Sequence, residues 1–156
     1  MSVRSHATGA LLAIVSVTVC AESAAPGALQ LRQAVEGRKA VYTLTAQNFA
    51  PLAAMQLGKA PFVAAEALKR AERVAFLAHL AEDAYPTWSQ EPASRARPAV
   101  WREWDDFSSR LNGFAGRAEA LAAQLRRAPQ GDESFRTAVA ALAKDCRSCH
   151  DTYRAD

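Results

Sequence analysis

The sequence predicts an all-α protein that folds as an antiparallel four-helix bundle with up-down-up-down topology. Three observations support this fold class. Alanine and leucine dominate the chain and β-branched residues are few, a composition that favours helices. Clusters of proline or glycine divide residues 22–156 into four stretches that could each be helical. Short connections at 58–61 and 129–131 force the helices on either side of them to run antiparallel.

The four expected helices cover residues 28–57, 62–82, 99–127 and 132–154. On the first, Val35, Tyr42 and Phe49 recur every seven residues and therefore share one face. The second helix is less regular. Its expected buried residues are Phe62, Leu68, Val74, Leu77 and Leu80.

The third and fourth helices have the clearest periodicity, because their apolar residues recur at steps of three and four, the spacing of a bundle seam. On the third helix these residues are Trp104, Phe107, Leu111, Phe114, Ala118, Leu121 and Leu125. On the fourth they are Phe135, Val139, Leu142, Cys146, Cys149 and Tyr153. We expect most of these side chains to be ordinary core.

Residues 1–21 are typical of a secretory signal peptide, with a short basic start, an apolar run over 11–19 and a small-residue cleavage site that ends at Ala21. Cleavage there removes Cys20 and leaves Cys146 and Cys149 as the mature thiols. The apolar run is too short to span a bilayer, and no later stretch is apolar over about 20 residues, so we expect no stable membrane span. The prediction is one domain over residues 22–156, exported to the periplasm.

The charge pattern argues against nucleic-acid binding. The chain has 19 basic and 16 acidic side chains, a formal net charge of +3. The basic residues are scattered along the predicted helices, Arg126-Arg127 being the one tight pair, and no aromatic residues are interleaved with them. We therefore expect no nucleic acid among the partners.

The chemistry of the chain is concentrated in residues 146–150, which read Cys-Arg-Ser-Cys-His. On a helix, Cys146, Cys149 and His150 lie at i, i+3 and i+4 and share one face. Two sulfurs can then bond a porphyrin edge while the imidazole reaches its iron, and C-x-x-C-H is the attachment signature of c-type haem. A redox dithiol would be expected within a βαβ pattern, and a zinc site would need a fourth ligand from one of two other histidines. The sequence thus favours one covalent haem c near the carboxyl end of the last helix.

The bundle topology predicts what surrounds this haem. The carboxyl end of the fourth helix lies beside the start of the first, the end of the second, the loop that follows and the start of the third. Met55 belongs to the opposite end, about 20 Å beyond Tyr42 along the same helix, and is excluded as an iron ligand. His79 is interpreted as a partly exposed surface histidine. The candidate haem contacts are Arg38, Tyr42, His79, Tyr85, Trp88, Arg97 and Trp101.

The terminal haem motif, the all-α chain and the export signal together resemble class II cytochromes c, specifically the cytochrome c′ family. Residues 34–42, 58–62, 96–101 and 146–154 are similar to the family's first helix, first turn, start of the third helix and haem helix. The resemblance implies thioether bonds from Cys146 and Cys149, axial ligation by His150, a propionate contact from Arg38 helped by Lys39, and Arg154 near the proximal imidazole.

The resemblance also implies that Tyr42 occupies the distal position, over the open face of the iron. The family often has leucine, phenylalanine or methionine there. Residues 84–92 depart from the family pattern of a Pro-Trp pair and glycines, which puts the propionate contacts of that loop in doubt.

The expected function is that of a periplasmic haem protein with high-spin, five-coordinate iron that binds nitric oxide or carbon monoxide, or carries electrons between redox partner proteins. The alternative is a low-spin or ligand-inert electron-transfer cytochrome. We do not expect an enzyme, because Tyr42 and His79 are the only acid–base groups near the predicted pocket. A homodimer is expected from the resemblance and from small residues on the first two helices, namely Ala46, Ala50, Ala53, Ala64 and Ala67.

Overall fold

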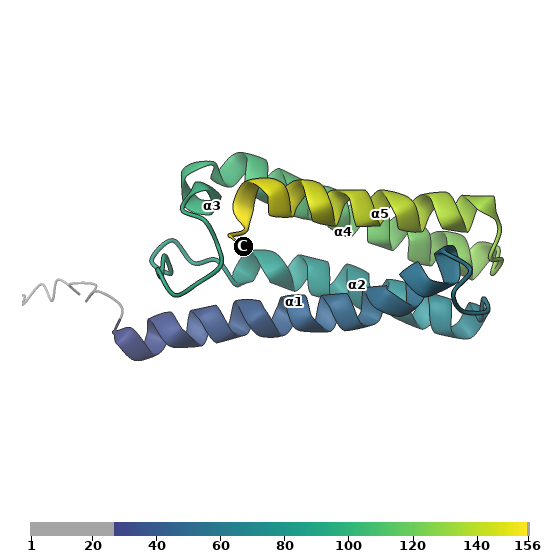
Figure 1. Cartoon of the computed structure of the whole chain (residues 1–156), viewed down its shortest axis with the longest axis horizontal. Coiled ribbons are helices and arrows are strands. Elements are labelled where there is room, and N and C mark those ends of the chain that lie inside the picture. Colours follow the sequence, from purple (N-terminus) through teal and green to yellow (C-terminus); the bar gives the residue numbers. More distant parts are fainter. Residues whose placement is uncertain (1–26, 156) are drawn as a thin grey trace, which may run out of the picture.

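The computed structural model describes residues 27–155 and contains five helices. These are α1 (Ala28–Gln56), α2 (Ala64–Asp83), α3 (Ala99–Arg102), α4 (Trp104–Arg127) and α5 (Glu133–Tyr153) (Figure 1). The predicted signal peptide, residues 1–21, lies outside the described residues. None of the described helices is long and apolar enough to cross a membrane.

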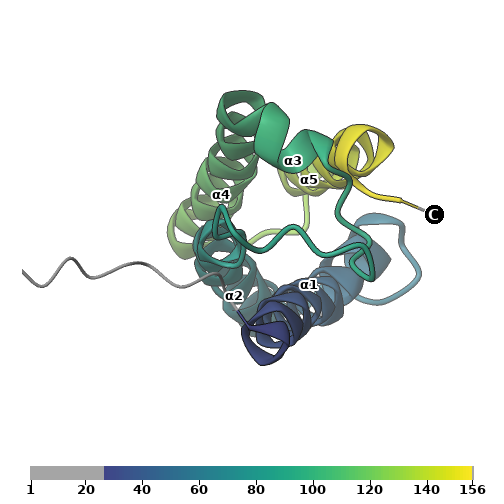
Figure 2. The ribbon, with the colours of Figure 1, turned by 90° about the vertical axis from the view of Figure 1, so that its left-hand side faces the viewer.

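The four long helices form a closed ring. α1 packs against α2, α2 against α4, α4 against α5, and α5 against α1. Figure 2, which looks along the bundle from the end that carries α3, shows these helices around a common interior. The loop between α2 and α3 crosses the same end, where α5 also finishes (Figure 1). The predicted antiparallel four-helix bundle is confirmed.

The prediction of one continuous helix over 99–127 is wrong at Glu103. This residue has φ −117° and ψ 42°, outside the helical region, and separates the single turn of α3 from α4. Contacts with the preceding loop account for the break, because the indole of Trp101 donates to the carbonyl of Pro86 at 3.1 Å. α3 is held against the loop, whereas α4 runs along the bundle axis. Tertiary contacts here override local helix propensity.

The second helix begins at Ala64, two residues later than predicted, because Phe62 packs into the α4–α5 connection instead. Its ring lies edge-on to Phe135 with centroids 5.1 Å apart. Gly131 is required at this contact, since an added Cβ would lie 2.5 Å from the Phe62 ring. The close approach fixes the end of the bundle opposite the haem motif.

Two groups of buried residues fill the interior. The far cluster lies toward the α4–α5 connection and comprises Leu52, Ala67, Ala71, Val74, Ala75, Ala118, Leu121, Ala122, Leu125, Phe135, Val139 and Leu142. The aromatic cluster lies at the motif end and comprises Ala81, Tyr85, Val100, Phe107, Leu111 and Tyr153, with Tyr42, Trp101, Trp104 and Cys149 partly buried against it. Met55 packs against the far cluster, as its predicted position requires.

Candidate functional site

The haem motif occupies the last turns of α5, which runs on to Tyr153. Cys146 and Cys149 are free and partly buried, and His150 is more exposed. Burial raises the pKa of the Cys149 thiol to about 11 and also raises the pKa of Cys146. A reactive redox dithiol needs a lowered thiol pKa, so this environment disfavours the dithiol alternative.

The zinc alternative finds no support in residues 27–155. They contain no group of three or more histidine, cysteine or acidic side chains that could hold a metal ion. His79 lies away from the motif, exposed on α2, with its Nε2 atom 2.8 Å from Glu119 of α4. It matches the expectation of a surface histidine.

The end of α5 is tied to the segment before α3. The backbone N–H of Arg97 donates to the carbonyl of Tyr153 at 2.9 Å, and Ala96 and Arg154 form an antiparallel bridge. The guanidinium of Arg97 donates to the carbonyl of Asp151 at 3.0 Å. Arg97 satisfies carbonyl groups that the end of a helix leaves free, and its predicted haem contact stays a prediction.

Arg38 is buried, with 4% of its surface exposed, although it lies on a bundle helix. Nη1 donates to the hydroxyl of Ser89 at 2.8 Å and to the carbonyl of Ala84 at 3.2 Å, while Nη2 donates to the carbonyl of Ser89 at 3.0 Å. Burial lowers the pKa of Arg38. Two of its three nitrogens thus anchor the loop that crosses the motif end.

The third nitrogen of Arg38, Nε, is buried and has no hydrogen-bond partner. An unsatisfied N–H on a buried guanidinium is costly, because it has lost its water without replacement. A carboxylate is the partner that suits it best. The site therefore fits a haem propionate here, as the resemblance implied.

Tyr42 is half-buried against the aromatic cluster, which also contains Cys149. Its hydroxyl accepts a hydrogen bond from Tyr85 at 3.3 Å, and the two rings meet edge-on with centroids 6.4 Å apart. Burial raises the pKa of both tyrosines. The residue predicted for the distal position therefore lies beside the predicted attachment point, and it is a protonated phenol.

The other predicted residues divide between the site and the surface. Trp101 belongs to the aromatic cluster, whereas Trp88 is 44% exposed and lies outside it. Lys39 is exposed and pairs with Glu36 at 2.8 Å, so its propionate contact stays a prediction. Arg154 Nη1 lies 3.4 Å from His150 Nδ1. Burial lowers the pKa of His150, and the positive charge of Arg154 lowers it further. Both effects favour the neutral imidazole that binds iron.

Sequence reasoning missed the serines that hold Arg38. Ser89 is fully buried and its hydroxyl bonds both Arg38 and the carbonyl of Pro86, while Ser94 lies 3.4 Å from Arg38 Nη2. The sequence signal that could have found them was the departure of residues 84–92 from the family pattern, which left the propionate contacts of that loop without obvious donors. Here the loop receives hydrogen bonds from Arg38.

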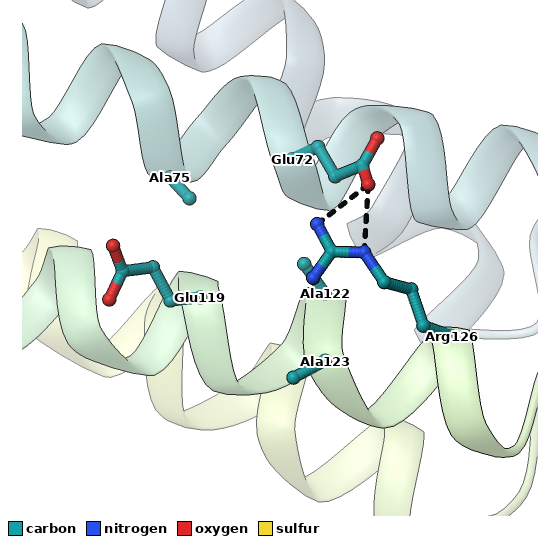
Figure 3. A pocket seen from close by; sticks show the side chains of 6 residues that line it. All are labelled: Glu72, Ala75, Glu119, Ala122, Ala123 and Arg126. Atoms are coloured by element: carbon teal, nitrogen blue, oxygen red, sulfur yellow. Dashed lines mark hydrogen bonds and ion pairs between the residues drawn. The ribbon is translucent and has the colours of Figure 1, made fainter.

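A groove on the outside of the bundle also carries charged side chains. It runs between α2 and α4 and is lined by Glu72, Ala75, Glu119, Ala122, Ala123 and Arg126 (Figure 3). Arg126 donates to one oxygen of Glu72 from Nε at 3.1 Å and from Nη2 at 2.7 Å. This exposed ion pair already uses the charges that a ligand would need, so the motif end remains the candidate site.

The sequence model of the family described as Cytochrome C′ matches residues 33–154. The chain belongs to the cytochrome c′ family. A cytochrome c′ of Cereibacter sphaeroides is 32% identical over 145 residues, which cover 90% of this chain and 95% of that protein. Proteins of this family carry one covalently attached haem c, so the cofactor that the C-x-x-C-H motif predicted is confirmed.

Two solved cytochrome c′ structures show the same architecture. Cytochrome c prime from Shewanella frigidimarina aligns with a TM-score of 0.74 at 33% identity, over 81% of this chain and 97% of that one. A nitric oxide complex of a cytochrome c prime variant from Alcaligenes xylosoxidans aligns with a TM-score of 0.73 at 27% identity, over 81% and 96% of the two chains.

Proposed function

We propose that this cytochrome c′ is a periplasmic protein whose haem iron is five-coordinate and binds small diatomic gases, nitric oxide and carbon monoxide. Cys146 and Cys149 form the thioether bonds and His150 is the axial ligand. The observation that carries the proposal is the makeup of the aromatic cluster. It brings Tyr42, whose phenol binds ferrous iron poorly, next to Cys149. Met55 and His79, which could bind iron more strongly, lie elsewhere.

The residues around the motif suit the cofactor. Arg38 Nε pairs with a propionate, and Arg154 lies beside the His150 ring. When bound, haem supplies an iron that can take a diatomic ligand or exchange one electron. Trp101 and Phe107 add apolar walls to the same cluster, which disfavours charged ligands and favours small neutral ones. The solved nitric oxide complex of a relative supports this choice of ligand.

Electron carriage to redox partner proteins is the second proposed role. Haem iron can exchange one electron as well as take a diatomic ligand, so the same site could serve both roles.

We propose binding or electron carriage rather than enzymatic turnover. A general base must be deprotonated at the working pH. The raised pKa of Tyr42 and of Tyr85 keeps both phenols protonated, and their hydroxyls bond each other. Both groups therefore serve as hydrogen-bonding walls of the site.

The test is a titration of the ferrous holoprotein with carbon monoxide and with nitric oxide, followed by Soret absorption. One gas molecule should bind per haem, with saturation. No spectral change at saturating gas would contradict the proposal. His79→Ala is the matched control and should bind as the parent does. A variant that binds much more tightly would instead identify His79 as an internal ligand.

We also propose a homodimer, through an interface that differs from the one predicted from the sequence. Ala67 is fully buried in the far cluster and cannot contribute to an interface, whereas Ala46 and Ala50 are exposed on α1. Leu44 on α1 and Phe76 on α2 are 46% and 65% exposed, and burying such side chains favours association. Sedimentation at micromolar concentration should give a dimer, and a monomer at all concentrations would contradict it.

A further inference from the structure

Tyr85 is held on every side that the structure describes. Its backbone N–H donates to the carbonyl of Glu82 at 3.1 Å. Its ring meets Phe107 edge-on at 4.8 Å and Trp101 at 5.9 Å, and the guanidinium of Arg38 lies 5.1 Å from its centroid. Only 8% of its surface is exposed. Tyr85 is therefore a fixed point of the aromatic cluster.

Tyr42 is held much less firmly. Among the described residues its ring pairs with one aromatic side chain, Tyr85, at the longer centroid distance of 6.4 Å. The bond between the two hydroxyls, at 3.3 Å, is long for an O–H···O contact. Tyr42 packs against the side of the aromatic cluster, where Tyr85 is the one aromatic ring of the described residues that it meets. Of the two tyrosines, Tyr42 therefore has fewer ring contacts to give up when it moves.

We propose that Tyr85 is a positioning residue that holds Tyr42 over the iron, so that a gas must break the Tyr85–Tyr42 hydrogen bond in order to bind. This inference rests on the proposed function and on the distal position of Tyr42. Cys149 packs against the same cluster, which puts the tyrosine pair beside the haem attachment point. Tyr85 acts through Tyr42 and need not touch the gas itself.

The size and kinetic form of the effect follow from the bond. A neutral hydrogen bond contributes modestly to a packed arrangement, and losing this long one should change the open population about two- to fivefold. Binding to a protein that must first open is slowed by the fraction that is open. Removing the bond should therefore raise the association rate of carbon monoxide and leave its dissociation rate near that of the parent.

The experiment measures carbon monoxide rebinding to ferrous holoprotein after flash photolysis, in the parent, Tyr85→Phe, Tyr42→Phe and the double variant. Each single variant should associate about two- to fivefold faster, and the double variant no faster than the singles, because both remove the same bond. Rates equal to the parent in Tyr85→Phe would overturn the proposal. So would additive gains in the double variant, or a gain that lies in dissociation.

A matched control separates this effect from general loosening. Phe135→Leu weakens the far cluster, at the other end of the bundle, and should leave the association rate unchanged. An equal gain in Phe135→Leu would show that any loss of stability opens the site, against the proposal.

A second readout needs no gas. In urea unfolding of the ferric holoprotein, the two tyrosine variants should show a coupling free energy that Tyr85→Phe and Phe135→Leu lack. If the parent binds no carbon monoxide, the proposed function fails while this cycle still tests the bond. If the parent binds and Tyr85→Phe matches it, the further inference alone fails.

Discussion

The far cluster and the aromatic cluster differ in whether their side chains leave polar atoms without hydrogen-bond partners. In the far cluster Phe135, Leu121 and Leu125 are each 1% exposed and have no polar atoms to pair. The aromatic cluster has a half-buried Tyr42 at its side and a buried Arg38 Nε without a partner. One end of the bundle is complete as a protein core. The other is completed by a cofactor.

The comparison shows how one bundle divides stability from function. The far cluster needs only apolar volume, which the helical repeat supplies. The aromatic cluster instead combines rings with hydroxyl, guanidinium and thiol groups that a haem can use. The following changes test whether the two ends are independent, beginning with the largest expected effect.

Removing both thioether bonds should have the largest effect. The variant Cys146→Ala/Cys149→Ala should lose all covalent haem, because these are the free cysteines of the described chain. Acid–acetone extraction of the parent should leave the haem on the protein, whereas any haem in the variant should be extracted. The variant Cys149→Ala alone should retain at most one thioether bond. Extractable haem in the parent would contradict the assignment.

Phe135→Ala should damage the far end only. Removing a fully buried phenylalanine costs about 3–5 kcal/mol of unfolding free energy, which urea denaturation of the ferric holoprotein would measure. The ferrous absorption spectrum should stay that of the parent, since Phe135 is in the far cluster. A changed spin state in the folded variant would show that the two ends are coupled.

Arg38→Gln should shift the reduction potential of the haem. Removing a buried positive charge near the proposed propionate favours the ferric state, so the potential should fall by on the order of 50 mV. Spectroelectrochemical titration measures it. Arg38→Lys keeps the charge without the guanidinium fork and should shift less. A rise in potential, or equal shifts in both variants, would argue against the propionate pairing.

Asp132→Asn should have the smallest effect, on acid stability at the far end. The hydroxyl of Ser134 and the N–H of Phe135 donate to Asp132 and lower its pKa below the ordinary value of 3.8. The carboxylate therefore stabilises the fold above that value, and this contribution is lost as pH falls through the folded pKa. Parent and variant should differ in urea midpoint at neutral pH and converge in acid, with identical haem spectra. A constant difference at all pH values would contradict this.

Much of the fold and the motif could be predicted from the sequence because both depend on local spacing. The helical period gave the four long helices and placed Met55 at the far end, and C-x-x-C-H needs only one helical face. The break at Glu103 could not be predicted, because it depends on Trp101 reaching Pro86 across the loop.

The fine structure of the site depends on the same loop. Ser89 and Ser94 meet Arg38 only through the path of residues 84–98, which have no periodic pattern. The hydrogen bond between Tyr85 and Tyr42 likewise joins residues 43 positions apart. Contacts of this kind come from tertiary packing, which composition and spacing leave open.

The spin state of the ferrous iron, with no gas added, tests most directly whether the aromatic cluster leaves the sixth position without a strong protein ligand. Absorption and magnetic circular dichroism spectra of the reduced holoprotein report it. High-spin, five-coordinate iron is the predicted result, because Tyr42 is the side chain proposed for that face. A low-spin, six-coordinate spectrum would contradict it and would mean that another residue reaches the iron.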